Sequence, residues 1–278
     1  MRSRRHILGQ NFLHHKPTIE KIASLVDARI DTAAQEGRPS RLLLEIGPGK
    51  LALTNALARV ASERKLPMAL VERDRFLEDE IRQGMPDADF RLMDAASDAL
   101  PEYLDELAAA NKTPIFVASN LPYSASSQIL ANLCHKSHLL SGLVVMVQKE
   151  LAERMVAEPG TGDRGAFSLL IQSYFELTWA FDVGPGAFNP PPKVTSTVLG
   201  LTPLAKPMTT ELRHPKKFEH FCKMLFSQRR KMVRNLVPNE KHEFFPKLGI
   251  SGTERPETLK LTTVLELYKL VATDQEEI

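Results

Sequence analysis

Arg41-Leu-Leu-Leu-Glu-Ile-Gly-Pro-Gly49, continued by Lys50-Leu-Ala-Leu-Thr-Asn-Ala-Leu57, is the stretch of sequence that decides the fold. A short apolar run that ends in a glycine turn is typical of a buried strand, and the apolar spacing after the turn is that of a helix. A strand, a glycine turn and a helix in this order predict an α/β protein with a mostly parallel sheet. Such sheets bind ligands at the carboxyl ends of their strands.

Three further apolar runs end in polar residues. Residues 68–71 lead into Glu72, residues 89–93 into Asp94, and residues 114–119 into Asn120. Because parallel strands end at one edge of a sheet, we expect these side chains to lie beside the glycine turn. Glu72 follows Gly47 by about 25 residues, where an acidic side chain can bind both hydroxyls of a ribose. Asp94 is placed to accept a hydrogen bond from the amine of an adenine ring.

The segment Asn120-Leu121-Pro122-Tyr123 suits a loop that holds an adenine for reaction at its amine. That amine is a poor nucleophile because its lone pair is delocalised into the ring, so hydrogen bonds accepted from it during attack help the reaction. Asn120 offers a side-chain carbonyl and Leu121 a backbone carbonyl, whose direction Pro122 restricts. Tyr123 offers a flat ring on which an unstacked base can lie. The same four residues also fit a simple turn after a strand.

Two other nucleotide-binding classes also use a glycine turn after a strand. Gly47-x-Gly49-x-x-Ala52 fits the dinucleotide fingerprint with alanine in third place, so a nicotinamide-dependent dehydrogenase is an alternative. That alternative gives no role to Asp94 or to the loop that begins at Asn120. A phosphate-binding P-loop is excluded, because Leu51 stands where serine or threonine is required. Glu72 also fits a solvated strand end, because it begins a charged run.

Together these motifs resemble the KsgA family of small-subunit ribosomal RNA adenine dimethyltransferases, over nearly the whole chain. The resemblance is carried in order by Gly9-Gln-Asn-Phe-Leu13, Glu45-Ile-Gly-Pro-Gly49 with Leu53-Thr54, Val71-Glu-Arg-Asp74, Asp94-Ala95, Asn120-Leu-Pro-Tyr123, Met146-Val-Gln-Lys-Glu150 with Ala152-Glu-Arg154, Phe188-Asn-Pro-Pro-Pro-Lys-Val194 and Phe226-Ser-Gln-Arg-Arg-Lys231. The last motif favours the small-subunit branch over resistance enzymes that act on large-subunit RNA, which share the first four motifs.

The resemblance implies a Rossmann-like class I methyltransferase sheet and S-adenosyl-L-methionine as cofactor. It places the cofactor against Asn11, Leu13, Gly47, Glu72, Asp94 and Asn120. It places the target adenine against Asn120, Leu121 and Tyr123, with Phe188 as a second stacking face. The implied reaction is in-line methyl transfer, performed twice per base, to N6 of two adjacent adenosines in a hairpin near the 3′ end of 16S rRNA. The implied partner is a pre-assembled small ribosomal subunit, and the implied oligomeric state is a monomer.

The chain departs from the family pattern at three places. Leu51 stands where glycine or alanine is frequent, which suggests different helix packing at the cofactor loop. Ser119 replaces a frequent glycine. Arg164-Gly165-Ala166 stands where Tyr-Gly-Arg is frequent, which leaves the role of that arginine open. None of the three changes an implied cofactor-contacting side chain.

The net charge of +2 is small, but the basic residues are concentrated toward both ends. Residues 1–16 contain Arg2, Arg4, Arg5 and Lys16 without an acid, and residues 205–238 contain nine Lys or Arg against two Glu. The spacing of Phe221, Leu225, Met232 and Leu236 predicts one helix with an inward apolar face. We expect its other face to meet RNA phosphates, although an ordinary solvated face is the alternative. The predicted RNA-binding side chains are Arg229, Arg230, Lys231 and Arg234.

Composition predicts two domains in a chain of 278 residues with 43% hydrophobic content. We expect a methyltransferase domain over residues 1–203, which begins with the basic arm 1–16 and whose sheet is closed by residues 193–201. Pro203 and Pro207 mark a linker, and residues 208–278 are expected to form a helical RNA-binding domain.

Other features of the sequence limit the classes of protein to which the chain can belong. No apolar stretch reaches the length of a membrane span, and two cysteines without metal-ligand spacing are typical of a reducing cytoplasm. The histidines at 6, 14 and 15 lack accompanying ligands, so no metal site is expected. A noncatalytic RNA-binding factor for ribosome assembly is the remaining alternative from another class; the intact Glu72, Asp94 and Asn120 motifs argue against it.

Overall fold

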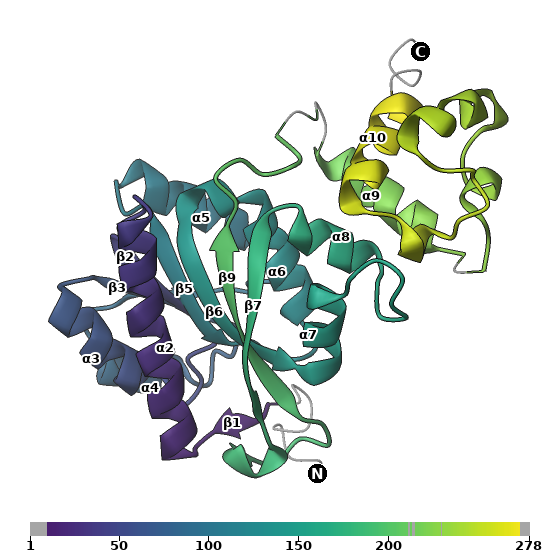
Figure 1. Ribbon diagram of the computed structural model, residues 1–278. Coiled ribbons are helices and arrows are strands. Elements are labelled where there is room, and N and C mark those ends of the chain that lie inside the picture. The colour runs from purple at the N-terminus through teal and green to yellow at the C-terminus, as the bar shows by residue number, and fades with distance from the viewer. Residues whose placement is uncertain (1–9, 211, 213–214, 229, 273–278) are drawn as a thin grey trace. The chain divides into compact units, whose positions relative to one another are not determined.

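The computed structural model of the chain describes residues 10–210, 212, 215–228 and 230–272. It divides into two compact units (Figure 1). The first contains the chain up to Ala152 together with Glu176–Pro203, and the second contains Glu153–Phe175 together with the residues from Leu204 on.

A seven-stranded sheet forms the centre of the first unit, in the order β4-β3-β2-β5-β6-β9-β7. The first five of these strands pair in parallel, and β9 pairs antiparallel with β6. The strands of the chain are β1 (Phe12–Leu13), β2 (Leu42–Ile46), β3 (Met68–Glu72), β4 (Asp89–Leu92), β5 (Ile115–Asn120), β6 (Leu140–Gln148), β7 (Phe175–Val183), β8 (Phe188–Asn189) and β9 (Ser196–Pro203).

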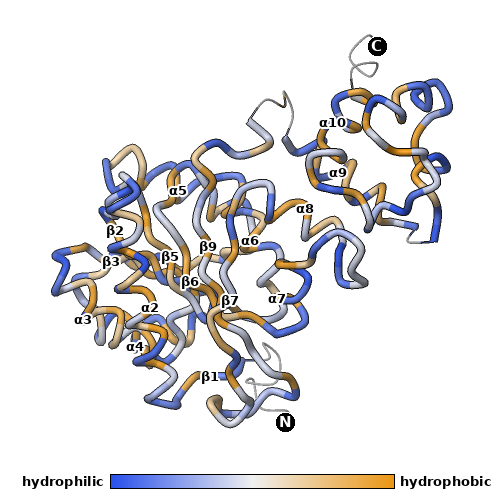
Figure 2. The backbone as a smooth tube through the Cα atoms, viewed as in Figure 1, coloured by the Kyte–Doolittle hydropathy of each residue, from blue (hydrophilic) through white to orange (hydrophobic). Residues whose placement is uncertain are grey.

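Helices cover both faces of the sheet, with α2, α3 and α4 on one side and α5 and α6 on the other (Figure 1). Strands β2, β3 and β5 are apolar and almost entirely buried, as two covered faces require (Figure 2). The helices of the first unit, and one that crosses into the second, are α2 (Lys16–Gln35), α3 (Thr54–Arg64), α4 (Glu78–Gly84), α5 (Ala99–Ala109), α6 (Ser126–His135), α7 (Lys149–Val156), and the 3₁₀ turns η1 (Ser137–Leu139) and η2 (Pro185–Ala187).

This architecture confirms the predicted parallel α/β sheet and the four strand ends at one edge. It corrects the position of the strand expected over residues 193–201. That strand, β9, lies between β6 and β7, so β7 and not β9 is the edge of the sheet.

A separate two-stranded sheet fixes the N-terminal arm. β1 pairs antiparallel with β8, with Phe12 opposite Asn189 and Leu13 opposite Phe188. The backbone N–H of His14 continues the pairing by donating to Ala187 O at 2.9 Å. The arm is therefore attached to a segment about 175 residues away in the sequence.

The second unit is helical. Its elements are α8 (Ala166–Gln172), α9 (Pro215–Phe226), η3 (Val233–Asn235), η4 (Asn239–Phe244), η5 (Pro246–Leu248), η6 (Pro256–Thr258) and α10 (Leu261–Ala272), together with the end of α7. Leu169 of α8 belongs to the same core as Phe218 and Leu225 of α9 and Leu267 of α10. The sequence placed residues 153–175 in the first domain, and this shared core is the reason that they group with the second unit.

The prediction of one helix through Leu236 was wrong. α9 ends at Phe226, and the apolar position that follows is Val233, which is fully buried, whereas Met232 is 42% exposed. The backbone N–H of Val233 donates to Glu254 O at 2.8 Å. This hydrogen bond to a distant segment fixes Val233, and not Met232, as the residue that packs into the core, so the chain does not continue as the helix that apolar periodicity predicted.

Arg164 stabilises the second unit from inside. Its side chain is 2% exposed, and its guanidinium donates to Ala157 O at 2.7 Å, to Gln172 Oε1 at 3.2 Å and to Leu259 O at 3.3 Å. These bonds join the segment before α8 to the segment before α10. Arg164 therefore has a structural role, which the sequence left open.

Candidate active site

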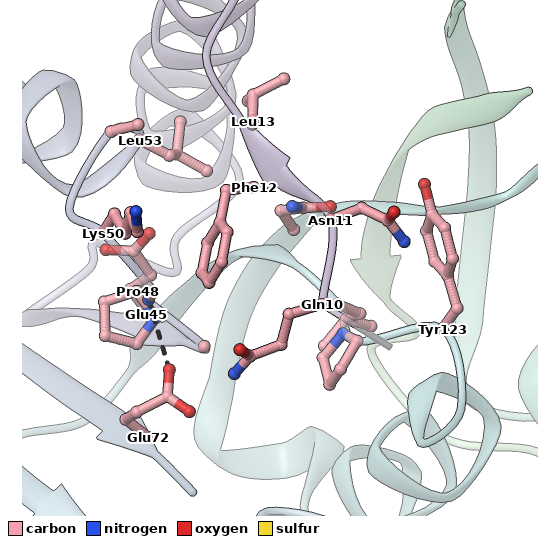
Figure 3. A pocket seen from close by; sticks show the side chains of 16 residues that line it. Gln10, Asn11, Phe12, Leu13, Glu45, Pro48, Lys50, Leu53, Glu72 and Tyr123 are labelled. Carbon is pink, nitrogen blue, oxygen red and sulfur yellow. Dashed lines mark hydrogen bonds between the residues drawn. The ribbon is translucent and has the colours of Figure 1, made fainter. Parts of the chain in front are cut away.

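Two cavities that share lining residues lie at the carboxyl edge of the sheet, within the first unit, and Figure 3 shows the first of them. Both are lined by Gln10, Gly47, Glu72 and Pro122. The first also takes Asn11, Phe12, Leu13, Glu45, Pro48, Gly49, Lys50, Ala52, Leu53, Asn120, Leu121 and Tyr123. The second is lined further by Ile46, Val71, Arg73, Asp74, Met93, Asp94, Ala95, Ser124, Ala125 and Ile129.

The glycine turn brings backbone against the first cavity. Gly47 and Gly49 have φ of 75° and 55°, a conformation that glycine adopts without the strain of a side chain. A Cβ atom on Gly49 would lie 3.2 Å from the Phe12 ring. Glycine at this position thus permits both the turn and the close approach of the N-terminal arm.

Leu51 adopts a backbone conformation that is unusual for a residue with a side chain. Its φ is 62°, in the left-handed region that costs a branched side chain about 1 kcal/mol or more. The side chain is buried, and its Cδ1 atom occupies the space that a Cβ on Gly84 would need. Leu51 and Gly84 of α4 are therefore complementary in size.

Glu72 is held in place before any ligand binds. Its Oε1 atom accepts from the backbone N–H groups of Arg73 at 2.8 Å and Asp74 at 2.9 Å. Its Oε2 atom accepts from Gly49 N at 3.3 Å, the dashed line in Figure 3. A carboxylate fixed at the end of β3 beside the glycine turn is well placed to bind vicinal hydroxyls.

Asp94 lines the second cavity and is oriented by its own loop. Its Oδ1 atom accepts from Ala96 N at 3.0 Å, and its Oδ2 atom accepts from Arg73 Nη1 at 3.1 Å. The buried Asn132 of α6 supports this loop by donating to the carbonyls of Ala95 at 3.1 Å and Ser97 at 2.8 Å.

The loop after β5 presents acceptor groups to the first cavity. Asn120 Oδ1 is buried and has no hydrogen-bond partner among the described residues. An unpaired buried carbonyl costs about 1 to 3 kcal/mol unless a ligand satisfies it, so this atom marks a place for a donor. The backbone N–H of Leu121 donates to Met146 O at 3.0 Å, which fixes the start of the loop. Ser119 Oγ donates to Ile46 O at 2.5 Å and ties this strand end to β2.

Tyr123 is anchored through its hydroxyl. Tyr123 Oη lies 2.6 Å from Ser196 Oγ at the start of β9. Burial raises the pKa of the Tyr123 phenol, and the hydrogen bond to Ser196 opposes this effect only in part. The ring is therefore neutral and held at a defined position beside the cavity.

Residues 10–13 of the N-terminal arm line the first cavity (Figure 3), and Gln10 also lines the second. Gln10 Nε2 donates to Asp74 Oδ2 at 3.1 Å, and Phe12 packs against Gly49. Asn11 and Leu13 line the first cavity. The pairing of β1 with β8 holds this arrangement.

Glu45 is a carboxyl at the end of β2 that reaches the first cavity. The residue is 1% exposed, and its Oε2 atom has no hydrogen-bond partner among the described residues. Burial raises the pKa of Glu45 to about 8, and the nearby Glu72 carboxylate adds to the rise. The nearby Thr54 hydroxyl lowers the pKa of Glu45 in part, but Thr54 Oγ1 does not meet the geometry of a hydrogen bond to the carboxyl.

Every predicted cofactor contact and three of the predicted base contacts line one of the two cavities. These residues are Asn11, Leu13, Gly47, Glu72, Asp94, Asn120, Leu121 and Tyr123. Phe188 does not line either cavity. The residue is 2% exposed and belongs to the hydrophobic core that includes Leu13.

The predicted RNA-binding side chains lie in the second unit. Arg230, Lys231 and Arg234 are exposed, but they follow α9 and do not form one face of it. Arg229 lies outside the described residues. Arg234 donates to Ser251 O at 3.2 Å.

Sequence reasoning assigned no role to several residues of the site, namely Gln10, Phe12, Glu45, Lys50, Asn132 and Ser196. A signal was available for Glu45, because it is the one acidic residue in the otherwise apolar strand Leu42–Ile46. Asn132 and Ser196 act through contacts with residues far away in sequence, which leave no local pattern.

The residues present fit S-adenosylmethionine. Two carboxylates that can accept hydrogen bonds from ribose hydroxyls and from an adenine amine, Glu72 and Asp94, lie at and just beyond the ends of the adjacent strands β3 and β4, beside the glycine turn. Within the described ranges, no three His, Cys, Asp or Glu residues are grouped to hold a metal ion. Over the same ranges, no helix has the length and apolar character needed to cross a bilayer.

Known proteins resemble this chain over nearly its whole length. A family model described as ribosomal RNA adenine dimethylase matches residues 1–273. The chain is similar to ribosomal RNA small subunit methyltransferase A of Pseudomonas aeruginosa, with 36% identity over 265 residues, 95% of this chain and 93% of that protein. The protein of the same name from Geobacter metallireducens is 37% identical over 256 residues, 92% of this chain and 86% of that protein.

Solved structures share the fold. A dimethyladenosine transferase from Plasmodium falciparum superposes with a TM-score of 0.69 at 21% identity, over 90% of this chain and 96% of that one. The 23S rRNA methyltransferase ErmE superposes with a TM-score of 0.63 at 22% identity, over 94% of this chain and all of that one.

Proposed function

Because the chain belongs to the ribosomal RNA adenine dimethylase family, we propose that it methylates N6 of adenines in small-subunit ribosomal RNA, with S-adenosylmethionine as methyl donor. The single observation that carries this proposal is the unpaired, buried Asn120 Oδ1 atom at the cavity that Glu72 and the glycine turn also line. The substrate is ribosomal RNA, and the enzyme is an N6,N6-dimethyltransferase.

The cofactor contacts follow from the geometry of the strand ends. We assign the ribose hydroxyls to Glu72, whose carboxylate three backbone amides already orient. Asp94 accepts from the adenine amine of the cofactor, and Gly47 leaves room for its amino-acid end beside Asn11 and Leu13. When bound, S-adenosylmethionine supplies a methyl group activated by a sulfonium.

The target adenine is held by the loop after β5. Asn120 Oδ1 and the Leu121 carbonyl each accept a hydrogen bond from one of the two N–H groups of the adenine amine. These two hydrogen bonds direct the lone pair of the amine toward the methyl group. After the first transfer one N–H remains, so one acceptor suffices for the second. Tyr123 supplies the stacking face. Positioning of this kind can account for much of a rate enhancement, and we assign no residue as a general base.

Finer points of the function are part of the same proposal. We propose that the target is two adjacent adenosines in a hairpin near the 3′ end of 16S rRNA, presented by a pre-assembled small subunit in the cytoplasm, and that the enzyme acts as a monomer. Arg229, Arg230, Lys231 and Arg234 are proposed to contact phosphates. The exposure of the three described side chains supports this role.

The test is transfer of labelled methyl from S-adenosylmethionine to small ribosomal subunits that lack the modification, with large subunits in parallel and digestion to nucleosides. Label in N6,N6-dimethyladenosine from small subunits alone is expected. Label only in large subunits would assign the chain to the other branch of methyltransferases. RNA binding without transfer would favour the noncatalytic assembly factor.

A further inference from the structure

Trp179 is the only tryptophan of the chain, and it lies at the surface of the first unit. It belongs to β7, the strand at the edge of the sheet (Figure 1). The residue is 38% exposed, and the proposed function gives it no role. A tryptophan ring at the surface offers a large, flat apolar face to a ligand.

A small network of side chains holds the Trp179 ring in place. Lys149 Nζ lies 5.9 Å from the centre of the ring and donates to Asp182 Oδ2 at 2.7 Å. Asp182 Oδ1 accepts from Thr197 Oγ1 of the neighbouring strand β9 at 2.9 Å. The hydrogen bond from Lys149 lowers the pKa of Asp182 most, and the Trp179 side chain lowers it further as another donor. Because the ring is already held, binding a base against it costs little ordering of the side chain.

The same network adjoins the loop that receives the target adenine. Lys149 directly follows β6, and its backbone N–H donates to Thr195 O at 2.9 Å. The next residue, Ser196, bonds to the Tyr123 hydroxyl at 2.6 Å. A short chain of contacts therefore connects the Trp179 ring with Tyr123, the proposed stacking ring for the target.

The exposed charges on the segments that meet here are mixed. Lys149 is already paired with Asp182. The exposed Lys193 is matched by the exposed acids Glu150 and Glu176. Such a surface attracts the phosphates of RNA only weakly. The part of a nucleotide that suits it is the base, because stacking on an aromatic ring needs no charged partner.

We propose that Trp179 is a stacking platform for an unpaired base of ribosomal RNA, in the same single-stranded loop as the target adenine. The inference rests on the proposed function, because it requires an RNA with unpaired bases around the target. An adenine that leaves its stack stays joined to its neighbours through the backbone, and those neighbours lose a stacking partner of their own. Every base has a π face, so the platform requires no particular sequence.

The first test is binding of the full-length chain to small ribosomal subunits that lack the modification, with S-adenosylhomocysteine present. Trp179→Ala should weaken this binding at least about fivefold, equivalent to about 1 kcal/mol, because stacking on an aromatic side chain contributes that much or more per base. Trp179→Phe keeps a flat ring and should lose less than about threefold. Both variants should bind S-adenosylhomocysteine alone with the affinity of the wild type in calorimetry.

The dependence on salt separates stacking from contact with phosphate. The slope of log affinity for subunits against log salt concentration should be equal in the wild type and Trp179→Ala, because stacking displaces no counterions from RNA. Thr178→Ala, an exposed substitution on the same strand, is the matched control and should bind subunits as the wild type does. A shallower slope in Trp179→Ala would overturn the inference, since the side chain would then act through phosphates.

Indole fluorescence reports the contact directly, because the chain has no other tryptophan. The probe is an end-labelled hairpin RNA with two adjacent adenosines in its loop, whose binding is followed by the anisotropy of the label. A base stacked on Trp179 should quench the indole emission as the RNA binds. Saturation of the chain with RNA without a change in this emission would overturn the inference.

Failure of this inference can be told apart from failure of the proposed function. Equal binding of subunits by the wild type and Trp179→Ala, with methyl transfer by the wild type, would overturn the inference and leave the proposed function intact. Absence of methyl transfer by the wild type to subunits that it binds would overturn the proposed function, whatever the affinity of Trp179→Ala.

Discussion

The ligand-free protein should lose stability as the pH rises from about 5 to 8, and Glu45→Gln should remove most of this loss. Glu45 has a pKa of about 8 in the folded chain, against an ordinary value of 4.5. Because the folded state binds the proton more tightly, the contribution of Glu45 is fully present below about pH 4.5 and is lost as the pH rises through 8.

The magnitude follows from the size of the pKa difference. Each pH unit between the two values costs about 1.4 kcal/mol, so the free energy of unfolding should fall by about 3 to 4 kcal/mol between pH 5 and pH 8. For a unit of this size, that corresponds to a fall of about 10 °C in melting temperature. The full value applies because the carboxyl is buried.

The assay is urea or thermal unfolding of the wild-type chain and Glu45→Gln at a series of pH values. The difference between the two proteins isolates Glu45, because all other titrating groups are shared. Glu63→Gln, an exposed substitution on α3, is the matched control for replacing a carboxyl with an amide at the surface. Parallel pH profiles for the wild type and Glu45→Gln would refute the reasoning.

Three further predictions concern the site and the elements that support it. Tyr123→Phe keeps the ring and loses only the bond to Ser196, so kcat/KM for RNA should fall less than about tenfold, whereas Tyr123→Ala loses stacking worth about 1 to 3 kcal/mol; equal losses would contradict the stacking role. Asn132→Leu should weaken S-adenosylhomocysteine binding severalfold in calorimetry with kcat retained, and unchanged affinity would exclude its support of the loop after β4. Gly84→Ala would place Cβ 2.4 Å from Leu51 Cδ1 and should destabilise the chain by about 1 to 3 kcal/mol in urea unfolding. Adding Leu51→Gly should abolish that penalty, and additive effects in the double-mutant cycle would refute the steric pairing.

The strands and their polar ends could be predicted because their signals are local. An apolar run that stops at Glu72, Asp94 or Asn120 indicates both a buried strand and the residue at which it ends. The parallel pairing of β4, β3, β2 and β5 then brings those ends together. The glycine turn is equally local, because φ at Gly47 and Gly49 depends on the residue itself.

What could not be predicted depends on pairing over long distances. The attachment of the arm to β8 joins Phe12 to Asn189, and no periodicity in either segment indicates the other. Phe188, which the resemblance implied as a second stacking face, takes part in this pairing and is 2% exposed, and its own segment shows no sign of either. Apolar spacing predicted that the helix of α9 continues past Phe226. Spacing holds no information about the hydrogen bond that the Val233 N–H donates to Glu254 O, a residue outside the predicted helix.

The central claim is that Asn120 acts in methyl transfer to adenine and contributes little to the affinity for the cofactor. It is tested most directly by comparing the wild-type chain with Asn120→Ala in two readouts: calorimetric affinity for S-adenosylhomocysteine, and N6,N6-dimethyladenosine formed on unmodified small subunits. We expect affinity within about tenfold, equivalent to about 1.4 kcal/mol, and loss of most transfer. Near-normal formation of dimethyladenosine by Asn120→Ala would contradict the account.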